Sequence, residues 1–135
     1  MASDLESALV AFLMAQTSVT SLLFNGDQSI FPLRADKDAR LPVLVYQRID
    51  TPSIHSKDGD MMLAHPRFQI TGWGAKYSDA RAVIAAVRAA LNAYVPPSFE
   101  GVNVAEIIVE DERDHSDPES LEYGRSLDAC IWVQE

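Results

Sequence analysis

Residues 101–135 read GVNVAEIIVEDERDHSDPESLEYGRSLDACIWVQE, and this stretch decides the fold. Its two ends alternate with a period of two, which predicts strands that each have two unlike faces. In the first strand Ala105, Ile107 and Val109 alternate with Glu106, Ile108 and Glu110; in the second, Leu127, Ala129, Ile131 and Val133 alternate with Ser126, Asp128, Cys130 and Trp132. The segment between them is expected to form an acidic loop.

Two amphipathic helices are predicted upstream of these strands. Ser3 and Glu6 have the spacing of a capping box, and an apolar stripe follows at helical spacing. A second helix is predicted to begin after Ser78, which is a favourable N-cap residue. The two stripes consist of Leu5, Leu9, Phe12, Leu13 and Gln16 in the first helix and Ala80, Val83, Ile84, Val87, Leu91 and Tyr94 in the second.

Three further segments have the pattern of strands. Residues 30–33 form a short apolar piece with Pro32, which suits a sheet edge because proline cannot donate a hydrogen bond. Residues 43–50 and 67–74 alternate as longer strands, and Gly72 and Gly74 predict a bulge or a close backbone approach. Residues 51–62 are interpreted as a long, mobile connection between the two.

The resulting order of elements is helix, short strand, strand, strand, helix, strand, strand. Helices on one side of a mainly antiparallel sheet form a two-layer sandwich. We therefore predict an α+β fold, with a mainly antiparallel sheet of four to five strands and two helices packed on one face. The length of 135 residues fits one domain, residues 1–135.

The charge and composition argue against several functional classes. The net charge is −9, and the eleven basic residues are scattered singly, whereas a nucleic-acid-binding face needs clustered Lys and Arg. The single cysteine, Cys130, is expected to be buried and unreactive. No apolar run approaches the roughly 20 residues that a membrane helix needs, and the first residues lack the basic region of a signal peptide.

The sequence contains only weak candidates for catalysis or metal binding. One is His55, Asp58, Asp60 and His65, whose spacing matches no metal motif; the other is Asp111, Asp114, His115 and Asp117 in the acidic loop. Clustered carboxylates suit hard cations, but a solvated loop explains the second group equally well. Glycine-rich phosphate loops and nucleophile elbows are also missing from the sequence. We expect no cofactor, no metal and no enzymatic activity.

Four ordered segments of the chain resemble the tail completion family of tailed bacteriophages, which includes tail terminator and tail-to-head joining proteins and those of gene transfer agents. The segments are SIFPL (29–33), LPVLVYQRI (41–49), RFQITGW (67–73) followed by YSDAR (77–81), and a closing hairpin with EDERD (110–114), DPE (117–119) and YGRSLD (123–128). Gly124 departs from the pattern, where a second basic or polar residue is expected. Gly72 stands where a larger or acidic residue is common.

The resemblance implies a structural virion protein that lies at the head-proximal end of the tail and passes through the host cytoplasm during assembly. Such a protein forms a ring with itself, implied to be a hexamer, on the tail tube protein. The ring stops tube growth and docks the head–tail connector or neck protein. DNA passes through it without specific binding, and the family has no membrane partner.

Three groups of residues are candidates for these contacts. Pro52, Ile54, Met61 and Met62 would supply an apolar contact to a neighbouring subunit or the tube, since methionine adapts to irregular surfaces. Arg48, Arg67 and Arg125, expected on outward strand faces, would form ion pairs between subunits. The acidic loop residues Glu110, Asp111, Glu112, Asp114, Asp117 and Glu119 would meet a basic partner or line the DNA channel.

Other functions remain open at this level. The chain could be another head–tail connector, neck or tube protein of similar fold. It could be a small metal-dependent hydrolase that uses the acidic loop 111–117. A cytosolic assembly or ligand-binding module is the third alternative.

Overall fold

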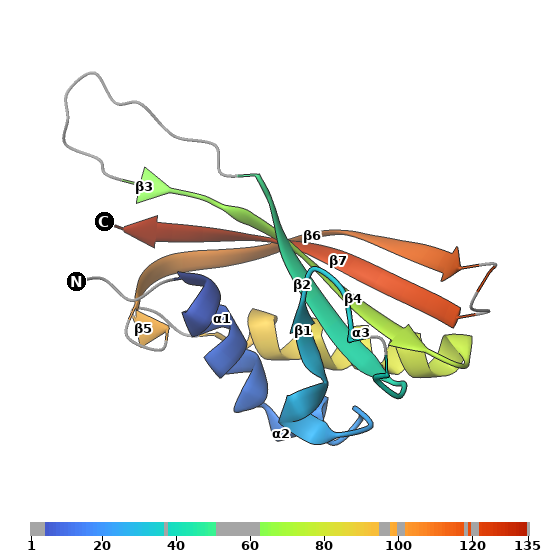
Figure 1. The fold of residues 1–135 in the computed structure, drawn as a ribbon. Helices are drawn as coiled ribbons and strands as arrows, with labels where there is room; N and C mark the ends of the chain where they lie inside the picture. The colour runs from blue at the N-terminus through green and yellow to red at the C-terminus, as the bar shows by residue number, and fades with distance from the viewer. Residues whose placement is uncertain are drawn as a thin grey trace.

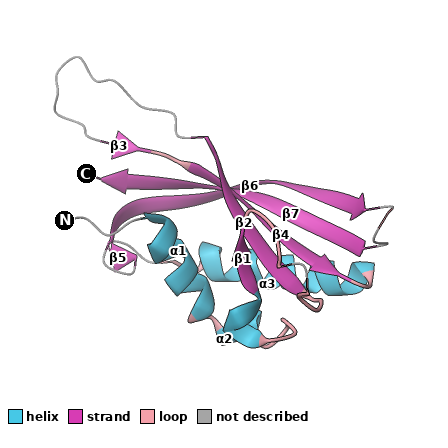
Figure 2. Cartoon of the chain, viewed as in Figure 1, coloured by secondary structure: helices cyan, strands magenta, loops and turns pink. Residues whose placement is uncertain are grey.

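The computed structural model describes residues 5–36, 38–50, 63–94, 98–99, 102–117, 119 and 122–134. A twisted sheet forms one layer, and the helices lie together on one of its faces (Figures 1 and 2). The elements are α1 (Leu5–Met14), α2 (Thr17–Thr20), the 3-10 helix η1 (Gly26–Ser29), β1 (Ile30–Pro32), β2 (Val43–Asp50), β3 (Leu63–Ala64), β4 (Arg67–Gly74), α3 (Tyr77–Asn92), β5 (Ser98–Phe99), β6 (Val102–Asp117) and β7 (Glu122–Gln134). The predicted α+β class and element order are confirmed.

The strand order across the sheet is β1-β2-β4-β7-β6-β5, and β3 pairs with the end of β7. Among the strands that the structure describes, β1 and β2 run parallel and the other pairs are antiparallel. The short β1 lies at an edge, as its proline predicted. Since β3 and β5 contain two residues each, five strands form most of the sheet, in agreement with the predicted four to five.

The core lies between the helices and the sheet face that they cover. Leu9 and Leu13 of α1 and Ile84 of α3 are completely buried there, against Phe68 of β4 and Leu127 of β7. The apolar stripes of both helices and of β7 therefore pack as predicted. One helix boundary was wrong: α3 begins at Tyr77, because the carbonyl of Lys76 accepts hydrogen bonds from the N–H groups of Asp79 and Ala80. The proposed Ser3 capping residue lies outside the described residues.

Glycines in β4 let α3 approach the sheet closely. A Cβ on Gly72 would lie 3.0 Å from Cγ1 of Val83, and one on Gly74 would lie 2.8 Å from Cβ of Asp79. The pairing of β4 with β7 is regular from Arg67 to Gly74, so the close approach, and not a bulge, explains both glycines.

The acidic segment was predicted as a loop, and this is wrong. β6 continues through it to Asp117 and pairs with β7 as one long hairpin (Figure 1). Two register shifts interrupt the pairing, one between Val104 and Glu106 and one between Glu110 and Glu112. Each extra residue exchanges the two faces of the strand. This is why Val104 is buried, Ala105 is exposed, and Ile107 again packs against the core.

No helix among the described residues is long and apolar enough to cross a membrane.

Candidate functional site

The sheet face opposite the helices, here called the open face, has an ordered layer of polar side chains. Gln47 of β2 donates a hydrogen bond to Gln69 of β4 over 3.2 Å. Farther across the sheet, a ring nitrogen of His115 lies 2.7 Å from the hydroxyl of Ser126, which is completely buried. Each pair joins side chains on two neighbouring strands. These hydrogen bonds hold the polar side chains of the open face in fixed positions.

Asp128 forms the most buried ionic contact on the open face. Arg113 donates hydrogen bonds of 2.9 and 3.1 Å to its two carboxylate oxygens. Only 6% of the Asp128 side chain is exposed, compared with 48% for Arg113. A buried carboxylate needs such a partner, because its transfer out of water is otherwise costly. The pair therefore ties β6 to β7 within the hairpin, next to the second register shift.

Trp73 lies on the open face in a row with Gly124 and His115, the residues that pair across β4, β7 and β6. Its ring rests on the Gly124 backbone: a Cβ at that position would lie 2.9 Å from two ring atoms. The ring centroid is 6.3 Å from that of His115. The Trp73 ring therefore packs directly on the backbone of Gly124, the residue that departs from the family pattern.

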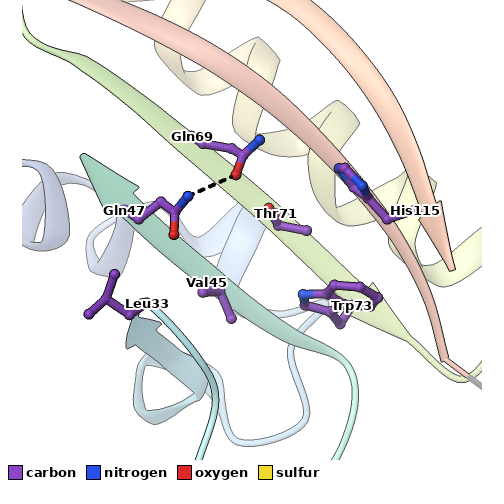
Figure 3. Close-up of a pocket in the computed structure, with 7 residues that line it drawn as sticks. All are labelled: Leu33, Val45, Gln47, Gln69, Thr71, Trp73 and His115. Carbon is purple, nitrogen blue, oxygen red and sulfur yellow. Dashed lines mark hydrogen bonds between the residues drawn. The ribbon is translucent and has the colours of Figure 1, made fainter. Parts of the chain in front are cut away.

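Two adjoining hollows flank Trp73. The first, the amide hollow, has a volume of about 210 Å³ and is lined by the residues labelled in Figure 3: Leu33, Val45, Gln47, Gln69, Thr71, Trp73 and His115. The second, the acidic hollow, has a volume of about 330 Å³ and shares Leu33, Val45 and Trp73 with the first. Its other walls include Asp36, Asp117 and Glu122. Together they form a continuous depression between the 33–41 segment and the end of the hairpin.

Leu33 stands in this depression in an unusual conformation. Its φ is 66°, and the N–H of Arg34 donates a 2.7 Å hydrogen bond to the carbonyl of Pro32, which closes a tight γ-turn around Leu33. The left-handed region is rare for a bulky residue without special need. Burial of the Leu33 side chain does not offset the cost of this conformation, because 71% of the residue is exposed.

A charged network occupies the other face of the hairpin, next to α3. Glu112 contacts both Arg88 of α3 and Arg125 of β7, the latter at 3.0 Å. Arg125 also lies 3.0 Å from Asp114 and from the hydroxyl of Tyr77. The network connects the outer half of the hairpin to α3 and balances the charges of Glu112 and Asp114.

Comparison with known protein families matches residues 7–134 to the family described as Tail completion protein gp17. The chain belongs to the tail completion protein gp17 family. Among solved structures, it is similar to a chain of "Virion of native gene transfer agent (GTA) particle", with a TM-score of 0.72 and 15% sequence identity. That match covers 97% of this chain and 95% of the other, so the likeness extends over the whole fold. No curated protein matches the sequence.

The arginines that we predicted at subunit contacts of this family member lie on different faces. Arg67 lies on the open face, 3.3 Å from Glu110. Arg48 instead lies on the helix side, above the Phe68 ring and 3.8 Å from Glu6, and Arg125 faces α3. The expectation that all three point outward is therefore wrong for Arg48 and Arg125, because their strands present these positions to the helix layer.

The apolar candidates Pro52, Ile54, Met61 and Met62 lie outside the described residues, as do His55, Asp58 and Asp60 of the first metal candidate.

The acidic residues are dispersed because they belong to a strand. Glu112 and Asp114 face α3, Glu110 faces Arg67, and Asp111 is exposed at the second bulge. Asp117 accepts a 3.0 Å hydrogen bond from the N–H of Glu119 at the hairpin turn. The six residues therefore do not act as one acidic loop.

Strand geometry also separates the second group of metal candidates. Asp114 contacts Arg125 on the helix side, whereas His115 points to the opposite face and bonds Ser126. Within the described residues, no three His, Cys, Asp or Glu side chains are placed to hold a metal ion. The hydrolase alternative depended on these side chains meeting in a loop, and the observed strand does not bring them together.

The sequence did not reveal the depression around Trp73. Its walls come from four separate parts of the chain, and Gly124 was noted in the sequence only as a departure where a second basic or polar residue is expected. The paired amides, hydroxyl and imidazole on this face are suited to recognition by shape and hydrogen bonding.

Proposed function

We propose that this chain is a non-enzymatic virion protein that completes the tail. In this proposal it forms a six-membered ring on the last ring of the tail tube, stops tube growth and presents a surface to the neck. The observation that carries the proposal is the family match over residues 7–134. The likeness of the whole fold to a chain in a gene transfer agent virion supports it.

The physical basis is interface burial repeated by symmetry. A closed ring requires a heterologous contact, in which one patch meets a different patch on the next subunit. Such contacts usually bury on the order of 1,200–2,000 Å² in total. We propose that Pro52, Ile54, Met61 and Met62 contribute apolar area to this contact or to the tube, and that Arg67 contributes to its specificity.

Passage of DNA through the ring is compatible with the charge distribution. The net charge of −9 gives the protein an overall repulsion for phosphates. The arginines Arg67, Arg113 and Arg125 each contact a carboxylate of their own chain, which reduces their attraction for a phosphate. We therefore propose that DNA slides past this protein without specific binding.

Deleting the gene from its parent phage or element tests the capping role. Tail lengths are measured by negative-stain electron microscopy, with and without the wild-type gene supplied in trans. Over-long, headless tails that complementation corrects are the expected result. Tails of normal length that do not join heads would assign the protein to the connector or neck, and infectious particles would contradict both roles.

A deletion of residues 54–61 separates ring formation from folding. The purified variant should retain the melting temperature of the wild type, but it should not support tail completion in the same complementation assay. Normal tail completion by this variant would show that the apolar residues Ile54 and Met61 are dispensable.

A further inference from the structure

We propose that the depression around Trp73 is a docking site for an arginine- or lysine-bearing segment of a different virion protein. The depression consists of the amide hollow and the acidic hollow, which share Leu33, Val45 and Trp73. This inference goes beyond the tube-capping role, since it names the chemistry of a partner and requires only that the protein belongs to a particle.

The apolar part of the depression is preformed in the isolated chain. Trp73 cannot tilt into the sheet, because its ring already rests on the Gly124 backbone and against His115. Val45 is buried beside it and forms the floor. A rigid aromatic wall lowers the entropic cost of binding, because little side-chain freedom remains to be lost.

Leu33 supports a binding role independently. A γ-turn with positive φ holds it in the depression with 71% of its surface exposed. Backbone strain of this kind is concentrated at functional sites and persists only where the surroundings enforce it. A hydrogen bond of 2.8 Å from the Leu33 N–H to the carbonyl of Tyr46 enforces it here. Covering this side chain by a partner would supply the burial that the isolated chain lacks.

The charge around the depression selects the partner. Asp36, Asp117 and Glu122 line the acidic hollow, and among the residues that the structure describes Arg34 is the only basic one in its wall. The local balance is therefore negative. An Arg or Lys side chain combines an apolar stem with a cationic head, which matches an apolar floor with a carboxylate rim. The face of Trp73 adds a favourable surface for a cation.

A second copy of this chain fits the site poorly. Its 11 basic residues are outnumbered by 20 acidic ones, so a second copy offers few cationic segments to an acidic hollow. Five of its eight arginines, namely Arg48, Arg67, Arg88, Arg113 and Arg125, already contact carboxylates of the same chain. The charge complementarity therefore favours a different, basic protein of the particle.

Photo-crosslinking in assembled particles tests this assignment. A photoreactive phenylalanine analogue replaces Leu33, and the matched control carries it at Phe24, which is 55% exposed in the helix layer. We expect the position-33 variant to cross-link to another virion protein, within a few residues of an Arg or Lys, and the control to lack this product. A product with a second copy, or no product in assembled particles, would overturn the proposal.

Charge variants show whether the rim matters. Asp36→Asn combined with Glu122→Gln should lower the yield of the position-33 product about fivefold, as expected for two exposed ion pairs. Asp38→Asn combined with Glu119→Gln removes the same charge outside the hollow walls and should leave the yield unchanged. Equal losses in both variants would contradict a specific site. Tail length, measured in the same particles, reports separately on the capping role.

A solution experiment does not require assembled particles. The purified chain is labelled with 5-fluorotryptophan and titrated with the peptide Ac-Ala-Leu-Arg-Leu-Ala-amide or with its glutamate counterpart. The arginine peptide should shift the fluorine resonance of Trp73 but not that of Trp132, and it should bind at least about fivefold more tightly than the glutamate peptide. Equal binding of the two peptides, or equal shifts of both tryptophans, would refute the site.

Discussion

Replacing Gly124 with alanine gives the sharpest test of how Trp73 is held. The new methyl carbon would lie 2.9 Å from two ring carbons of Trp73 and 3.1 Å from a third. Carbon atoms in contact prefer about 3.5–4.0 Å, so the ring must move outward by roughly half an ångström or more. Overpacking of this kind costs about 1–2 kcal/mol, near the low end of the usual range, because Trp73 is half-exposed and can give way.

Urea denaturation followed by far-UV circular dichroism measures this loss as a lower transition midpoint at an unchanged slope. The same substitution in a Trp73→Leu background is the control. Without the ring the clash disappears, and alanine should then be neutral or stabilise the protein by about 0.5–1 kcal/mol through the unfolded chain. An equal destabilisation in both backgrounds would refute the conclusion that the missing side chain of Gly124 makes room for the Trp73 ring.

Three further substitutions test other parts of the fold. Ile84→Ala in the completely buried centre of α3 should lower the unfolding free energy by about 2–5 kcal/mol, measured by the same urea titration. Glu112→Ala should cost about 1–2 kcal/mol, because Arg88 and Arg125 lose a shared carboxylate, and 1 M salt should reduce the difference from the wild type. Tyr94→Phe should cost about 1 kcal/mol, because the Tyr94 hydroxyl donates a 2.7 Å hydrogen bond to the carbonyl of Val104. Burial raises the pKa of the Tyr94 hydroxyl above its ordinary value near 10. The stabilisation by the neutral hydroxyl is therefore fully present below pH 10 and is lost as the pH rises above that value. The Tyr94→Phe variant should lose less stability above pH 10 than the wild type.

Local patterns were sufficient to predict the class of the fold. The stripes of α1 and α3 and the alternation in β7 identified the buried faces correctly, since one face of each element must pack on the core. Pro32 correctly marked an edge strand. These features depend on the nearest neighbours in the chain, and they are visible without knowledge of the tertiary structure.

Long-range pairing explains what the sequence did not show. The acidic run 110–117 has a composition typical of a loop, but pairing with β7 holds it as a strand. Its carboxylates contact Arg88 and Arg125, and its own Arg113 contacts Asp128 of β7. The two bulges exchange its faces, so counting alternate residues from Val109 assigns the wrong side beyond Asp111. The depression around Trp73 requires four distant segments to meet, and no spacing within one segment predicts it.

The long β6 strand also affects how the protein behaves in a crowded particle. β5 covers only its first two residues, so most of its outer edge has no neighbouring strand among the described residues. An unprotected edge of this length invites other chains to add strands and aggregate. Here the two bulges divide the edge into two shorter regular stretches, Glu106–Glu110 and Glu112–Asp117, and both ends of each stretch carry a carboxylate. We therefore expect many copies to be stored together before assembly without joining edge to edge into fibres, which leaves the faces of the sandwich to form the specific contacts.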